Sequence, residues 1–288
     1  MPSVASRHLA FLLTAFILGD RKRSSFTKAK KPRRNKPEPK RCALIFCAAL
    51  MITLGLSANR SGNVQSKISL PIESGRPVAD GVRALESACG CAITYEDPLY
   101  VHPSEINDVT ESVRRDLDKY PPGKAPRVLV PKGGSLNLEY DPALLKSDPA
   151  RVVRDLVAAN ASQRNPGRFR VLKDGQIIHV IPTAFKNRKG VLTRQASVLD
   201  AVISPPSLTK SLYQMLREIC AEISKATNTH IVVGGFPLNG LVSYRQSLPS
   251  KPLRARDLLT RLLGPRQSWQ LFYGPGERMY ALNIHSVR

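Results

Sequence analysis

The segment MLREICAEISKATNTHIVVGG, Met215–Gly235, reads as an amphipathic helix that ends in a turn and continues into a short strand. A similar segment, GVRALESACGCAITYEDP, occupies residues 81–98. A shift of 138 positions, 228 minus 90, superposes the apolar helix positions of the two segments and carries Gly90 onto Asn228. Glycine and asparagine are the residue types that best tolerate the positive φ of a helix end. The chain therefore contains a repeated helix and strand.

The repeat continues on both sides of this pair. Extended stretches precede both helices, KISLPIE from Lys67 and LDAVISP from Leu199. Strand-like segments follow, GGSLNLEYDP from Gly133 and NGLVSYRQ from Asn239, and each leads into a second helix. Each unit closes on a hairpin, so both read strand, helix, strand, strand, helix, strand, strand. The sequence thus predicts an α+β fold with two tandem modules.

The modules are expected at residues 67–183 and 196–288, with an insertion in the first at about 100–132. The closing hairpins are expected to turn at Asp174–Gly175 and at Pro275–Gly276, the latter suiting a type II turn. These turns place the last two strands of each module side by side.

Helix signals mark where the helices begin and which face they bury. Pro77 suits the first turn of one helix, Asp148–Pro149 form a cap and first-turn pair, and Ser207 is the expected cap of the helix through Met215. Leu216 and Leu262 fall on the apolar faces and are expected core residues.

The segment SLTKSLYQMLREICAEISKATNTHIVVGGFPLNGLVSYRQSLPSKPLRARDLLTRLL resembles the secretin and TonB short N-terminal domain family. The shared pattern is a helix ending in a Gly or Asn turn, a short strand, an alternating strand and a second helix. The resemblance covers about residues 199–286, and residues 67–183 with the inserted segment as an interruption. It implies a pair of periplasmic modules that bind proteins and carry no catalytic group.

The N-terminus carries an export-like pattern. Residues 1–58 hold 12 Lys/Arg and two Asp/Glu of a chain whose net charge is +22. A basic segment, residues 1–41, precedes the apolar run Cys42–Ala58, which is typical of a signal peptide or a transmembrane anchor. Basic residues before the run would hold residues 1–41 in the cytoplasm. We therefore expect the remainder to be exported to the periplasm or cell envelope, anchored in the inner membrane if the run is not cleaved.

Cysteine is the first candidate for chemistry. Cys42 and Cys47 lie in the apolar run, which leaves Cys89, Cys91 and Cys220. An odd number argues against a disulfide framework, and residues as close as Cys89 and Cys91 form a strained disulfide if they form one. Without a second pair at ligand spacing the pair is not a zinc site, so a structural role is favoured over a redox role. Cys220 is expected in the core.

Other residue types give no catalytic pattern. The histidines are scattered, Asp116 and Asp118 are two apart on an expected helix and so on different faces, and no phosphate-binding loop occurs. Arginines are dispersed among acids, which disfavours nucleic-acid binding. Aromatic residues of the closing hairpins are expected in the core, namely Phe169, Trp269, Phe272 and Tyr273. We expect no catalytic, cofactor or metal residues.

Three functions follow from these observations. The favoured one is a non-catalytic envelope protein that binds a protein partner in signalling or in an export or uptake assembly, through the free edges of small sheets. The alternatives are an envelope hydrolase or thiol redox enzyme, and a basic protein that binds an envelope polymer. A redox enzyme would need a reactive thiol at Cys89 or Cys91, and charge-driven polymer binding would weaken steeply with salt.

Overall fold

The computed structural model describes residues 66–206, 211–237 and 250–287. Contacts divide the chain into a unit of residues 1–64 and a unit of residues 65–288, and every described residue belongs to the second. The basic segment and the apolar run Cys42–Ala58 lie outside the described residues. Within the described ranges, no helix has both the length and the apolar character needed to cross a membrane.

We call residues 66–194 the first half and residues 195–287 the second half. The main elements of the first half are β1 (Ile68–Ser74), α2 (Pro77–Cys89), β2 (Ile93–Glu96), β5 (Gly134–Tyr140), α4 (Pro142–Ser147), α5 (Pro149–Ser162), β6 (Arg168–Asp174), β7 (Ile177–Lys186) and β8 (Leu192–Arg194). Those of the second half are η3 (Val198–Asp200), β9 (Val202–Ile203), α6 (Leu212–Thr227), β10 (Ile231–Val233), β11 (Leu253–Arg254), α7 (Ala255–Leu263), β12 (Gln267–Gly274) and β13 (Met279–Ser286). This mixture of helices and strands is consistent with the predicted α+β class.

Most predicted helix ends are confirmed. Helix α2 begins at Pro77 and ends at Cys89, and Gly90 caps its end with a φ of 65°. Helix α6 ends at Thr227, and Asn228 caps its end with a φ of 51°. The predicted start of α6 was wrong, because the helix begins at Leu212 behind Ser211, which forms a capping box with Gln214. The predicted cap, Ser207, lies outside the described residues.

Strand pairing follows one pattern in both halves. Strand β1 pairs antiparallel with β5, and β9 pairs antiparallel with β11. Strand β2 pairs parallel with β7, and β10 pairs parallel with β13. The closing hairpins β6–β7 and β12–β13 are antiparallel. Because β12 also pairs parallel with β2, the main strands form one sheet in the order β10-β13-β12-β2-β7-β6, with β8 beside β7.

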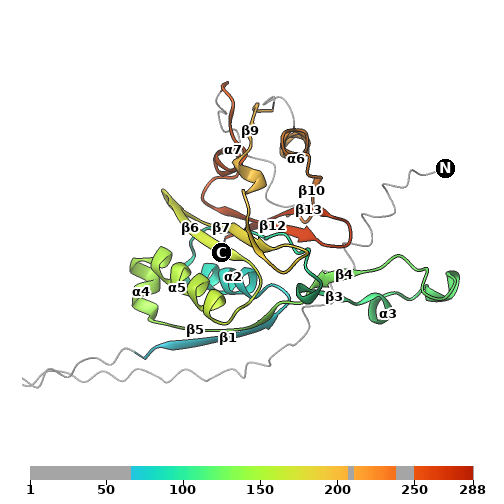
Figure 1. Cartoon of the computed structure of the whole chain (residues 1–288). Coiled ribbons are helices and arrows are strands. Elements are labelled where there is room, and N and C mark those ends of the chain that lie inside the picture. The colour runs from blue at the N-terminus through green and yellow to red at the C-terminus, as the bar shows by residue number, and fades with distance from the viewer. Residues whose placement is uncertain (1–65, 207–210, 238–249, 288) are drawn as a thin grey trace, which may run out of the picture. The chain divides into compact units, whose positions relative to one another are not determined.

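The continuous sheet lies between two sets of helices (Figure 1). Helices α2 and α5 cover one face and form a core with Ile93, Tyr95 and Phe272. Helices α6 and α7 cover the other face and form a core with Trp269 and Leu271. Because alternate residues of β12 point to opposite faces, the strand contributes to both cores. Leu216 and Leu262 are buried, as predicted, and so are Trp269, Phe272 and Tyr273, whereas Phe169 is only partly buried.

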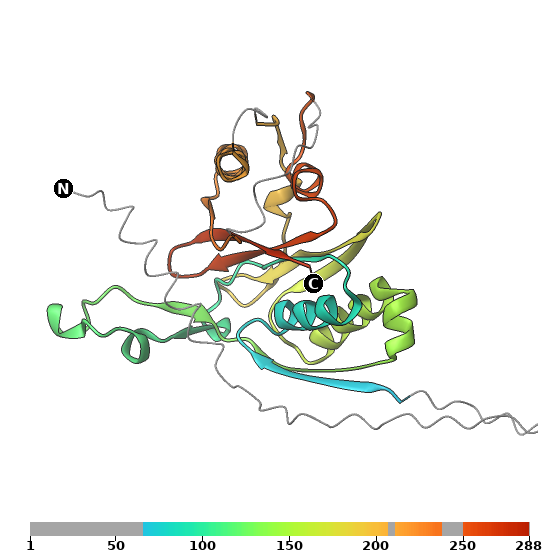
Figure 2. The ribbon, with the colours of Figure 1, turned by 180° about the vertical axis from the view of Figure 1, so that it is seen from behind.

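The inserted segment forms an arm that extends from the sheet (Figure 2). It contains η1 (Pro103–Glu105), β3 (Ile106–Asp108), α3 (Thr110–Val113), η2 (Leu117–Lys119) and β4 (Leu129–Pro131). Strands β3 and β4 pair antiparallel at its base. The helix expected through Asp116 and Asp118 is wrong, because only a single 3₁₀ turn forms there. Asp116 precedes that turn and binds Arg114.

Two further details differ from the prediction, and one predicted strand lies outside the described residues. Helix α4, capped by Asp141, was not foreseen between β5 and α5. The predicted strand at NGLVSYRQ, residues 239–246, lies outside the described residues, so it stays a prediction. The turn after β12 is not type II at Pro275–Gly276, because its positive φ falls on Arg278 and not on Gly276. The turn at Asp174–Gly175 is confirmed, with a φ of 56° at the glycine.

Candidate functional site

A buried polar network lies where the two halves meet, at the end of β2. Leu271 of β12 pairs with Glu96, and the Asp97 N–H donates to the Leu271 carbonyl oxygen at 2.8 Å. Every residue of β2 is buried, because helices cover both faces of the sheet. Polar side chains in such a strand must find partners inside the protein. The side chains of Glu96 and Asp97 have separate sets of hydrogen-bond partners.

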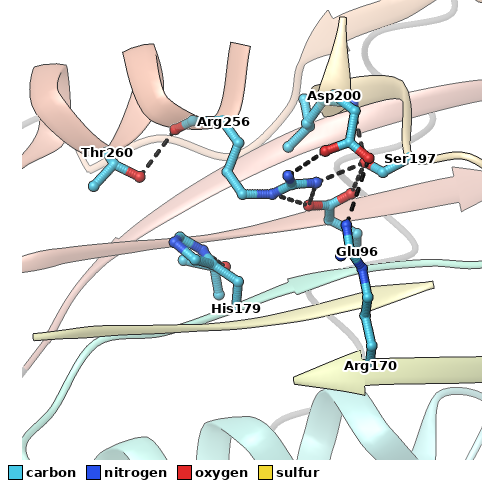
Figure 3. A network of polar contacts seen from close by, with 9 residues as sticks. Glu96, Arg170, His179, Ser197, Asp200, Arg256 and Thr260 are labelled. Atoms are coloured by element: carbon cyan, nitrogen blue, oxygen red, sulfur yellow. Dashed lines mark hydrogen bonds and ion pairs between the residues drawn. The ribbon is translucent and has the colours of Figure 1, made fainter. Parts of the chain in front are cut away.

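Glu96 forms a buried ion pair with Arg256 of α7 (Figure 3). Both Nε and Nη2 of Arg256 donate to Glu96 Oε1, at 2.9 and 2.8 Å. The Ser197 hydroxyl donates to the other carboxylate oxygen and accepts from Arg256 Nη2. The side chains of Glu96 and Arg256 are 1% and 3% exposed. This network therefore joins β2 of the first half to α7 of the second.

Arg256 also forms an ion pair with a second carboxylate. Its Nη1 donates to Asp200, which Arg170 of β6 approaches at 3.7 Å from the other side. Burial raises the pKa of Glu96, and the positive charge of Arg256 opposes that rise. Arg256 is the only cation among the described residues that hydrogen-bonds Glu96, and its charge opposes the effect of burial on the Glu96 pKa.

Asp97 is held by four donors. Arg76 Nε donates to it at 2.7 Å, the hydroxyls of Tyr95 and Tyr100 at 2.8 and 3.2 Å, and the Tyr273 N–H at 2.9 Å. Arg76 also donates to the Tyr273 carbonyl oxygen and lies over the ring of Phe272. Burial raises the pKa of Tyr95 and Tyr100 well above the usual value, so both remain donors. Asp97 thus joins both halves through the second half's β12.

A third buried group, His179 on β7, faces the same side as Glu96. Its Nδ1 lies 2.8 Å from the Thr94 hydroxyl, and its ring contacts Trp269. Burial lowers the pKa of His179 to about 4, and the nearby charge of Arg256 adds to the effect. His179 is therefore neutral near pH 7 and packs as part of the core.

The cysteine pair forms a disulfide, Cys89–Cys91, which the odd number of cysteines did not predict. Both residues are partly buried, and Cys89 is the last residue of α2. A helix C-terminus disfavours negative charge, so it does not activate a thiolate. Cys220 is buried in the core as expected, and burial raises the pKa of its thiol to about 12.

The remaining candidates do not gather into one place. Asp116 lies in the arm and His230 is exposed just before β10. Within the described ranges, no group of three or more His, Cys, Asp or Glu residues is arranged to hold a metal ion. A shallow hollow beside α6 is lined by Ser204, Pro205, Pro206, Glu218 and Glu222, none of which was a sequence candidate.

The backbone edge of β1 is a second candidate site. Asn165 donates to the Ser135 carbonyl oxygen of β5 at 2.7 Å. In its favourable amide orientation, Gln163 donates to the same oxygen at 2.6 Å and accepts from the Asn137 N–H at 3.2 Å. The outer edge of β5 is therefore covered by the end of α5. It also follows that Ser135 and Asn137 direct their backbone groups away from β1.

Residues opposite one another in an antiparallel pair both point inward or both point outward. Glu73 and Pro71 pair with Ser135 and Asn137, and Ser69 pairs with Glu139. The backbone groups of Ser69, Pro71 and Glu73 thus point away from β5. Among the described residues nothing pairs with this edge, so β1 offers two N–H donors and three carbonyl acceptors, with no donor at Pro71.

The chain matches no family model, no curated protein and no solved structure. The sequence alone did not single out Glu96, Asp97 and Arg256, the residues that join the two halves. Glu96 and Asp97 belong to the segment ITYEDP. Two acidic residues at the end of a strand suggest an exposed turn and not a buried site. A signal was nevertheless present in the sequence, because the 138-residue shift relates Glu96 and Asp97 to Gly234 and Gly235, which carry no side chain.

Proposed function

We propose that the chain is a non-catalytic cell-envelope protein that binds a protein partner through two repeated αβ modules. The strand-pairing pattern of the two halves supports the repetition. A matching hydrogen bond supports it further, since the Ile93 N–H donates to Glu86 and the Ile231 N–H donates to Ser224, both at 3.0 Å. Each pair of positions is separated by the same 138-residue shift that relates Gly90 to Asn228.

The two modules differ where they meet. The first uses Glu96 and Asp97 to hold the second, whereas the second has Gly234 and Gly235 there and leaves β10 at the end of the sheet. The carboxylates singled out by the geometry are therefore occupied in joining the halves. This arrangement favours a binding role for the exposed edges over a catalytic role for the buried polar groups.

The observation that carries the proposal is the open edge of β1. Its outward donors and acceptors can pair with an extended segment of another protein, which is how strand addition gives affinity. Pro71 makes the edge selective, because a partner strand finds no donor at that position. The apolar residues Ile68, Leu70 and Ile72 lie on the core-facing side of β1, and Ile68 is exposed.

Proline substitution on this edge gives the test. In Ser69→Pro and Glu73→Pro the lost N–H points outward, so pairing with β5 is retained while a donor to the partner is removed. We expect both variants to fold and to lose a partner that the wild type captures by photo-cross-linking at Ser69. Cross-linking from Gln176, exposed in the β6–β7 turn, is the control site. If the folded variants capture the partner as well as wild type does, a partner strand does not bind at this edge of β1.

The proposed location is the cell envelope, outside the cytoplasm. Its support is the order of the basic segment, residues 1–41, and the apolar run Cys42–Ala58. The thiol-enzyme alternative is less favoured because the Cys89–Cys91 disulfide lies at a helix C-terminus, where a thiolate is not stabilised.

A further inference from the structure

We propose that the turn between β7 and β8 docks onto an anionic lipid surface. The turn and the strand ends beside it present cations together with two exposed aliphatic side chains. We call this surface the basic hairpin tip and define it by Lys186, Arg188, Lys189, Val191, Leu192 and Arg194. The proposal is independent of the partner strand proposed for β1.

The cations of the tip are concentrated in sequence and in space. Residues 164–194 contain eight Lys or Arg against one Asp. Ala184 pairs with Arg168 on one side and Arg194 on the other, so these two side chains flank the end of β7. Lys186 approaches the arm residue Glu105 at 3.7 Å. Among the described residues, Arg188, Lys189 and Arg194 have no ion-pair partner.

The aliphatic residues decide the kind of partner. Val191 and Leu192 are 58% and 53% exposed and adjoin the cations. A soluble acidic polymer would need only the positive charges. A bilayer also accepts aliphatic side chains below its headgroups, and the combination of cations with exposed apolar residues is typical of interfacial binding.

The tip is rigid enough to present these side chains together. The Asn187 carboxamide oxygen accepts from the N–H groups of Lys189 and Val191, at 2.9 and 3.1 Å. The Asn187 N–H donates to the Val191 carbonyl oxygen, and Gly190 supplies the positive φ of 80° that closes the turn. A preformed turn loses little conformational entropy on docking.

Co-sedimentation with vesicles tests the proposal on residues 65–288, which form a separate compact unit without the apolar run. Vesicles of equal parts phosphatidylcholine and phosphatidylglycerol should bind this unit, and pure phosphatidylcholine vesicles should not. The variant Arg188→Gln/Lys189→Gln should bind roughly 30-fold more weakly, at about 1 kcal/mol per charge. Val191→Ser/Leu192→Ser should bind about tenfold more weakly or worse, since it removes apolar area that would be buried.

Val202→Ser is the matched control, because Val202 is 62% exposed on β9 and lies outside the tip. Its binding should equal that of wild type. The proposal is overturned if wild type fails to bind the anionic vesicles. It is equally overturned if Val191→Ser/Leu192→Ser binds them fully while wild type binds soluble polyphosphate as tightly, because a charged polymer would then be the partner.

Discussion

Replacing Arg256 by Ala should destabilise the protein by about 3–5 kcal/mol, because it leaves the Glu96 carboxylate buried without a counter-charge. The expected readout is a lower urea midpoint, followed by the fluorescence of Trp269, the single tryptophan of the chain and a fully buried residue. Arg254→Ala is the matched control, since Arg254 is exposed two residues away. Its effect should remain within about 0.5 kcal/mol.

The Arg256→Ala variant should also acquire a characteristic pH dependence. Burial already raises the pKa of Glu96, and the variant removes the charge that opposes the rise. A carboxyl with a raised pKa in the folded state favours folding at low pH, and that contribution is lost as pH rises through the folded-state pKa. The deficit relative to wild type should therefore be smallest near pH 4 and grow towards pH 7. A deficit that is the same at both pH values would contradict the buried ion pair.

Replacing Asp97 by Ala should have a comparable effect, about 3–5 kcal/mol, for a related reason. The substitution removes the acceptor of Arg76, of two tyrosine hydroxyls and of the Tyr273 N–H. The hydroxyls of Tyr95 and Tyr100 are buried, so the variant would leave these donors without an acceptor inside the protein. Urea denaturation measures the loss.

Asp118→Ala provides the comparison, because Asp118 is an exposed carboxylate of the arm. It should unfold at the urea concentration of wild type. Asp97→Asn should be intermediate, since one amide oxygen can still accept from some of the donors. If Asp97→Ala were as stable as Asp118→Ala, the junction would not depend on this carboxylate.

Sequence signals that act directly on the local backbone predicted the helices and most of their ends well. Proline at the start of α2, glycine and asparagine at the ends of α2 and α6, and the apolar helix faces require no knowledge of distant residues. The start of α6 was misplaced because Ser207 and Ser211 are both good caps. The capping box with Gln214 favours Ser211.

The joining of the halves could not be predicted from those signals. Whether β12 pairs with β2 depends on contacts between residues far apart in the chain, such as Arg256 with Glu96. The alternation of β12, with Trp269 and Phe272 in different cores, also reads as an ordinary amphipathic strand until both helix layers are known. The sequence predicted binding through free sheet edges, but it did not show that the end of α5 covers the edge of β5 while β1 stays open.

The central claim, that β1 accepts a strand from a protein partner, is tested most directly by amide hydrogen exchange. In the free protein the N–H groups of Ser69 and Glu73 point away from β5 and should exchange quickly. Adding the partner identified by cross-linking should slow the exchange of both, while the Asn137 N–H, already bound by Gln163, should change little. Unchanged exchange at Ser69 and Glu73 in a saturated complex would contradict strand addition at this edge.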